Sequence, residues 1–261
     1  MFHRPLVSKL WLLAALGLGA QASAVTVGFD PGAAGLAGAA FSADALTGTE
    51  VSVVSNGPPA GDGSFSWHER GFMHITGSLQ NGVQVLPSGL DSQYTLYAAF
   101  DILGVNPNIV SPGHSTAVTM ALYGVNGVSV FGLGPAGAFV DNQGNAPVLL
   151  ASAANAAVSV ASTLVSLTPL TLDLSASMTA DLVPAPVGFI TSPGLALSLL
   201  GSFSHPHDGV TVLYGGGAFV IDGGSDVLSF APSPVPEPAH AALLAGGLAL
   251  LAGLARQRRS A

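Results

Sequence analysis

Short stretches of alternating apolar and polar residues dominate the chain from about residue 25 to residue 230. In the clearest, at 170–179, Leu, Ala or Met fills every even position and Thr, Asp or Ser every odd one. Alternation with a period of two is typical of a strand with one buried and one wet face. The segment 151–165 fits a strand or a helix equally well.

Turn-forming dipeptides separate these stretches. Asn-Gly and Asp-Gly adopt positive φ easily and suit tight hairpins, so we expect a hairpin around 116–133. Many short strands between turns predict an all-β fold, as an antiparallel β-sandwich or jelly-roll-like domain. The dipeptides lie at 56–57, 81–82, 126–127 (Asn-Gly) and at 62–63, 208–209, 222–223 (Asp-Gly).

Charge is scarce and unevenly placed. Charged residues make up 8% of the chain, against roughly 25% in an average domain. Between residues 25 and 235, Arg70 is the one Lys or Arg against thirteen Asp and Glu, a net charge of −12. Nucleic acid is therefore not an expected partner, because phosphate binding needs clustered cations. The chain has no cysteine, which excludes disulfides and thiolate metal sites.

The first 24 residues have the composition of a secretion signal. Arg4 and Lys9 precede an apolar run at 10–19, and Ala-Gln-Ala-Ser-Ala follows at 20–24. This order of basic, apolar and small residues predicts a signal peptide at 1–24, cleaved after Ala24, with Ala22 as the alternative. A short buried helix is the competing interpretation.

The other end combines prolines, an apolar stretch and arginines. Residues 232–238 read Pro-Ser-Pro-Val-Pro-Glu-Pro, which favours an extended linker. Residues 241–255 carry no charge, and a helix over 239–255 would be about 25 Å long. Three arginines, Arg256, Arg258 and Arg259, follow it and would stay on the cytoplasmic side. We therefore expect a transmembrane helix and basic tail at 239–261.

This tail resembles the PEP-CTERM sorting signal of exported bacterial proteins. The matching parts are Pro236-Glu237-Pro238, the apolar helix and the final arginines, together about a tenth of the chain. The resemblance implies that an exosortase in the inner membrane recognises the tail and cleaves near the motif. The protein would then reach the outer cell surface or the extracellular matrix. A plain membrane anchor is the alternative.

Two further segments, 41–54 and 90–100, resemble the flocculation-associated PEP-CTERM proteins. That resemblance implies a structural or adhesive role in biofilm, floc or exopolysaccharide association. Together with the sorting tail, it predicts an exported, non-enzymatic surface protein with a β-rich domain at 25–231. A secreted polysaccharide-binding module or a glycan hydrolase is the alternative.

The densest set of functional groups is Trp67-His68-Glu69-Arg70 with His74. In a strand, His68, Arg70 and His74 share one face and could bind a sugar or transfer protons. The competing interpretation is a polar strand face with a Glu–Arg contact.

Two other segments offer metal ligands. His205, His207 and Asp208 could place two imidazoles and a carboxylate around one ion, or simply form a turn. Asp222 and Asp226 flank a Gly-Gly-Ser turn, and we expect them, or the turn at Asp62, to bind Ca²⁺ weakly if any cofactor is bound. The chain contains no nucleophile elbow, phosphate loop or zinc-protease motif.

Overall fold

The computed structural model describes an all-β protein. It covers residues 25–107, 112–129, 131–133, 139–141, 146–167, 170–192, 197–206, 208, 210–213 and 218–232. The strands are β1 (Val27–Phe29), β2 (Phe41–Ala43), β3 (Ala45–Asn56), β4 (Phe65–Gln80), β5 (Val83–Val85), β6 (Tyr94–Asn106), β7 (Gly113–Asn126), β8 (Phe131–Leu133), β9 (Phe139–Asp141), β10 (Val148–Leu167), β11 (Leu170–Pro184), β12 (Leu197–His205), β13 (Val210–Leu213), β14 (Ala218–Asp222) and β15 (Ser225–Pro232).

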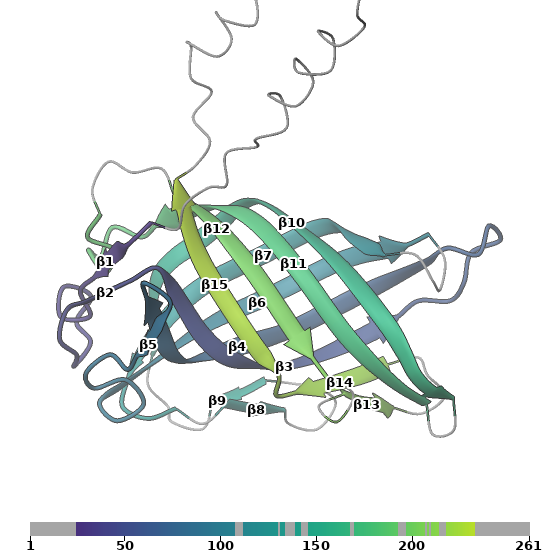
Figure 1. Cartoon of the computed structure of the whole chain (residues 1–261), viewed down its shortest axis with the longest axis horizontal. Coiled ribbons are helices and arrows are strands. Elements are labelled where there is room, and N and C mark those ends of the chain that lie inside the picture. The colour runs from purple at the N-terminus through teal and green to yellow at the C-terminus, as the bar shows by residue number, and fades with distance from the viewer. Residues whose placement is uncertain are drawn as a thin grey trace, which may run out of the picture.

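Eight of these strands close into an antiparallel barrel (Figure 1). The order around the wall is β3-β15-β12-β11-β10-β7-β6-β4, and β4 pairs with β3 along most of its length to complete the circle. Strands β13 and β14 extend the sheet beside β3, and β5 adds a short hairpin to β4.

The all-β, antiparallel prediction is confirmed, whereas the sandwich or jelly-roll arrangement is wrong. A sandwich has two sheets with separate edges, but here β3 is hydrogen-bonded along both sides and the eight strands form one continuous wall. The alternating pattern could not reveal this, because the walls of sandwiches and barrels both alternate with a period of two.

The predicted strands show the expected division of faces. The even positions of 170–179 belong to β11, where Leu172, Leu174, Ala176 and Met178 face the barrel interior. The ambiguous segment 151–165 is part of β10. The outward positions of β11 and β12 are mostly Ser and Thr, so hydroxyl groups provide polar surface there that the few charges cannot.

The turn predictions had mixed outcomes. Asn81 and Gly82 both have positive φ and connect β4 to β5 as a tight hairpin. The hairpin expected at 116–133 is not formed: β7 pairs with β6 and β10, whereas 131–133 pairs with 139–141. The Gly127 amide instead donates to the Gln93 carbonyl, so tertiary contacts override the local turn signal.

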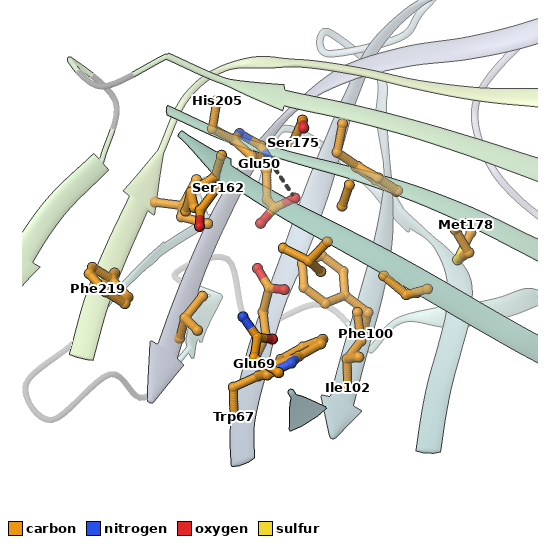
Figure 2. A pocket seen from close by; sticks show the side chains of 18 of the residues that line it. Glu50, Trp67, Glu69, Phe100, Ile102, Ser162, Ser175, Met178, His205 and Phe219 are labelled. Carbon is orange, nitrogen blue, oxygen red and sulfur yellow. Dashed lines mark ion pairs between the residues drawn. The ribbon is translucent and has the colours of Figure 1, made fainter. Parts of the chain in front are cut away.

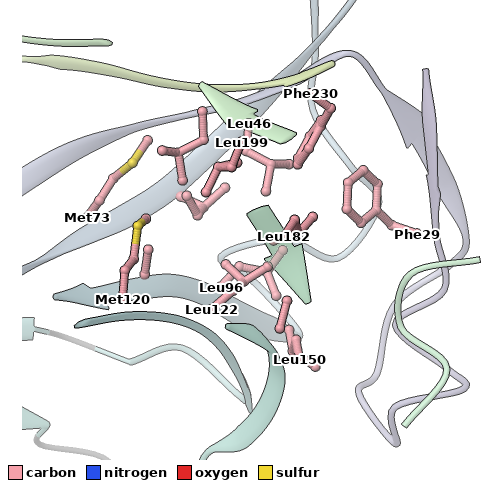
Figure 3. Close-up of a cluster of buried hydrophobic side chains, with 14 of the residues drawn as sticks. Phe29, Leu46, Met73, Leu96, Met120, Leu122, Leu150, Leu182, Leu199 and Phe230 are labelled. Atoms are coloured by element: carbon pink, nitrogen blue, oxygen red, sulfur yellow. The ribbon is translucent and has the colours of Figure 1, made fainter. Parts of the chain in front are cut away.

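One end of the barrel is filled by apolar side chains (Figure 3). Phe29 lies at its centre, stacked on Phe41 with ring centroids 4.9 Å apart and tilted against Phe189 and Phe230. Strands β1 and β2 cover this end, which we call the packed end (Figure 1, left). The Val25 amide donates to the Phe230 carbonyl, so the described chain starts beside the strand with which it finishes.

The predicted signal peptide, the C-terminal helix with its basic tail and the proline-rich linker lie outside the described residues, except that Pro232, the first linker residue, ends β15. The described part of the chain contains no helix with the length and hydrophobicity that crossing a membrane requires.

Candidate functional site: an interior cavity with a buried acidic cluster

Beyond the packed end, the barrel contains a partly open cavity of about 650 Å³, part of whose lining is drawn in Figure 2. Of its 23 lining residues, 16 are apolar, five of them aromatic. Asn56, Asn106 and Ser162 line it near the ends of β3, β6 and β10, so the cavity extends away from the packed end. The cavity lining and the packed cluster are continuous, because five residues belong to both: Trp67, Ile102, Met120, Val158 and Met178.

Four ionisable side chains come together in the wall of this cavity. Glu50 comes from β3, Glu69 from β4 and His205 from the end of β12, and all three line the cavity. Asp226, on β15, is 1% exposed and contacts the same group without lining the cavity. We call Glu50, Glu69, His205 and Asp226 the interior cluster.

The interior cluster is linked through His205. Its Nε2 atom lies 3.3 Å from Glu50 Oε2 and 3.8 Å from Asp226 Oδ1. Its Nδ1 atom is 3.0 Å from the Gly223 carbonyl oxygen, which can only accept, so Nδ1 carries a hydrogen. The Glu69 carboxyl group interacts directly with that of Glu50 and accepts a hydrogen bond of 2.9 Å from the Ser52 hydroxyl.

A β-bulge places this cluster. Strand β14 pairs with the end of β3 and β15 with its beginning, on the same side. From the pair Asp222↔Val51 to the pair Asp226↔Gly48, the chain advances four residues from β14 to β15 but only three along β3. The extra residue lies in the Gly223-Gly224 turn, whose φ values are 105° and 109°. Bulges of this kind re-aim side chains, and this one turns Asp226 inward.

The turn also holds the histidine. The Gly223 amide donates to the Glu50 carbonyl, and the Gly223 carbonyl accepts from His205. A Cβ atom on Gly224 would collide with His205 Nδ1 and with the Ser204 carbonyl oxygen. Gly224 is therefore needed both for its positive φ and for the close approach of the imidazole.

Burial dominates the electrostatics of the carboxyl groups. Burial first, and then the charge of Glu50, raise the pKa of Asp226 to about 8. The same two causes hold the pKa of Glu69 well above its usual range, although the Ser52 hydrogen bond favours the charged form. Desolvation of an unpaired charge is costly, so these carboxyl groups retain protons that exposed ones would lose.

His205 behaves in the opposite way. Burial by itself would lower its pKa, but the hydrogen bond and charge of Glu50, followed by the charge of Asp226, outweigh burial and raise the pKa to about 9. The imidazole is therefore protonated at neutral pH when no other cation is present. With three carboxyl groups and one imidazole, the cluster would carry a charge of −2 if every group were ionised.

The structure divides the Trp67–His74 set between two faces. Trp67 and Glu69 line the cavity, whereas His68, Arg70 and His74 lie on the outer wall. His68 Nε2 lies 2.9 Å from Asp101 Oδ1, and His74 Nε2 lies 2.8 Å from Asp91 Oδ1. The shared face of the two histidines and Arg70 is as expected, but Glu69 does not join it, since neighbours in a strand point to opposite sides.

The predicted metal ligands are separated as well. Asp226 is buried in the cluster, while Asp222 is exposed at the end of β14, because the bulge reverses the facing of all residues after it. Asp208 is exposed, and His207 lies outside the described residues. Asp62 accepts hydrogen bonds from the Ser64 amide and hydroxyl at 3.0 and 2.6 Å, which is the geometry of an ordinary turn.

Glu50 was not recognised from the sequence as a candidate functional residue. The proximity of the four residues of the interior cluster was not predicted either. Local alternation pointed the other way: Val51 and Val53 occupy one phase of the segment and Glu50 and Ser52 the other, which is the pattern of a polar residue on a wet strand face. No protein-family model, curated protein or solved structure matched the chain in searches of each kind.

Proposed function

We propose that the protein is an exported surface protein whose barrel binds a small, largely apolar molecule. The observation that carries this proposal is the cavity of about 650 Å³ with its predominantly apolar lining. Ligand pockets commonly have volumes of about 300–1,000 Å³, apolar walls and a few polar groups. An eight-stranded barrel is the size that can hold one small ligand.

Polar groups for orienting such a ligand are present in the lining. Within the described ranges, Trp67 Nε1 and Asn106 Oδ1 are buried and have no hydrogen-bond partner. A donor and an acceptor near one end of the cavity, with the interior cluster in its wall, favour a ligand with an apolar body and a polar group. Buried polar atoms normally have hydrogen-bond partners, and a bound molecule would supply the partners that these two atoms lack.

The cavity proposal can be tested by filling the cavity. The neutral fluorophore Nile red should bind the full chain, purified in mild detergent, with a blue-shifted emission above the detergent background. Ala176→Trp places an indole in the cavity and should abolish this signal. Ser177→Trp adds the same group at the next, exposed position and should leave it unchanged. Equal binding by both variants contradicts the proposal.

Surface delivery is the second part of the proposal and is supported by the resemblance of the tail to exosortase substrates. Pro232, the last described residue before that tail, ends β15 close to Phe230 at the packed end. Glu237→Ala should accumulate as an unprocessed membrane-bound precursor in the native host. Release of this variant at the wild-type rate contradicts sorting through the motif.

Contact with exopolysaccharide in a biofilm or floc is a second candidate function. Tyr97 and Tyr123 stack on the outer wall with ring centroids 5.3 Å apart, and aromatic surfaces of this kind suit sugar rings. Retention of the protein on the host's own exopolysaccharide should fall for Tyr123→Ala and persist for Ala176→Trp. This result would separate the outer wall from the cavity.

A further inference from the structure

Three side-chain atoms in the interior cluster lie where the ligands of one metal ion would lie. One imidazole nitrogen of His205 and one carboxyl oxygen each of Glu50 and Asp226 lie within 4.8 Å of one another. Around an ion with bonds of about 2.0–2.2 Å, tetrahedral ligand atoms are about 3.3–3.6 Å apart. The distances of 3.3 and 3.8 Å from His205 Nε2 to the two carboxylates are close to this spacing.

The imidazole is oriented as a metal ligand would be. Its Nδ1–H donates to the Gly223 carbonyl, so Nε2 is the nitrogen that faces the carboxylates. Metal-bound histidines usually donate their other ring N–H to a carbonyl or carboxylate, which fixes the tautomer and the ring orientation. The Gly223-Gly224 bulge provides that support here.

The carboxylates lack the partners that buried carboxylates need. Among the described residues, no group forms a hydrogen bond of normal geometry with either carboxyl oxygen of Asp226 or with Glu50 Oε1. The Ser204 backbone amide only weakly favours the charged form of Asp226. Both residues are at most 3% exposed. Arg70, the only Lys or Arg between residues 25 and 235, is exposed on the outer wall. Nothing described in the chain besides His205 can therefore balance the cluster.

We propose that Glu50, His205 and Asp226 bind one divalent first-row transition-metal ion, of which Zn²⁺ is the representative. The imidazole ligand and the small ligand number favour such an ion over Ca²⁺, which takes six to eight oxygens. Glu69, held by Ser52 beside Glu50, supports the site from the cavity side. Binding of the ion would release protons, because metal ligands bind in their deprotonated forms.

Zinc titration of the full chain tests this proposal. The protein carries a tag without histidine, is stripped with a chelator and is titrated with Zn²⁺ at neutral pH by calorimetry, with elemental analysis after dialysis. We expect one Zn²⁺ per chain that Asp226→Asn weakens at least about tenfold, since even supporting residues of metal sites cost that much. Asp222→Asn makes the same change on the outer face and should leave the affinity unchanged.

Folding of the Asp226→Asn variant is checked by circular dichroism, and Glu50→Gln provides a second variant if it does not fold. Absence of Zn²⁺ binding at millimolar concentration overturns the proposal. Zn²⁺ binding that survives both substitutions also overturns it, because the ion would then lie on surface histidines. Binding of Ca²⁺ with the same affinity as Zn²⁺ overturns it as well. Nile red binding is measured in parallel: its presence without Zn²⁺ binding rejects the metal site only, and the reverse rejects the cavity function only.

Discussion

The two ends of the barrel share the same eight strands and differ in what fills their interior. At the packed end, Phe29, Leu46, Leu150 and Phe230 interlock and are all at most 2% exposed. At the other end the inward side chains leave about 650 Å³ unfilled, and charged groups take positions that apolar residues hold elsewhere. One end is close-packed, while the inward side chains of the other leave a cavity between them.

This contrast predicts that equal truncations have unequal costs. Phe230→Ala at the packed end should lower the free energy of unfolding by about 3–5 kcal/mol, because it leaves a void in a close-packed core. Phe203→Ala in the cavity wall should cost no more than about 1–2 kcal/mol, since its ring already borders empty space. Urea denaturation compares the two. Similar losses would show that the cavity does not persist in solution.

A second prediction concerns the bulge that supports the interior cluster. Alanine at Gly223 or Gly224 should cost about 1–3 kcal/mol through backbone strain, because both have positive φ. Gly224→Ala should cost more than Gly223→Ala, since only its Cβ atom collides with His205 and Ser204. Thermal melting of the two variants isolates that collision. Equal melting temperatures would mean that the imidazole is not held as described.

A third prediction is a pH dependence of stability that arises in the hollow end. Asp226, with a pKa of about 8, and His205, with a pKa of about 9, hold protons that the unfolded chain releases at lower pH. The native state therefore binds more protons than the unfolded state, and stability falls as pH rises through this range. Glu69, whose pKa is also raised, interacts with His205, so these groups do not titrate independently.

The metal-free protein should accordingly melt several degrees lower at about pH 9 than at about pH 5. Asp226→Asn should weaken this pH dependence of the melting temperature, because asparagine is neutral at every pH, whereas a carboxyl group at this buried position is destabilising once it loses its proton. Asp222→Asn, exposed on the outer wall, should not. A wild-type melting temperature that rises over the same interval would contradict the raised pKa values.

Some features of the site could be read from the sequence and others could not. The alternation at 170–179 predicted which side chains of β11 face inward, and His205 and Asp226 were both recognised as ligand-type residues. Their predicted partners, His207, Asp208 and Asp222, were neighbours along the chain. The structure instead pairs them with Glu50 from a distant strand, because barrel closure brings β12, β15 and β3 side by side.

By itself, the sequence determined the strand class, the polarity of each face and the hydroxyl-rich outer wall. These follow from local alternation and turn chemistry, which act within a few residues. Only the tertiary structure decided that the sheet closes on itself, that one end stays hollow and that Glu50, Glu69, His205 and Asp226 meet there. Those outcomes depend on the pairing of β3 with both β4 and β15 and on a single extra residue at Gly223-Gly224. One inserted residue reverses the facing of every side chain that follows, and no periodicity within one strand records it.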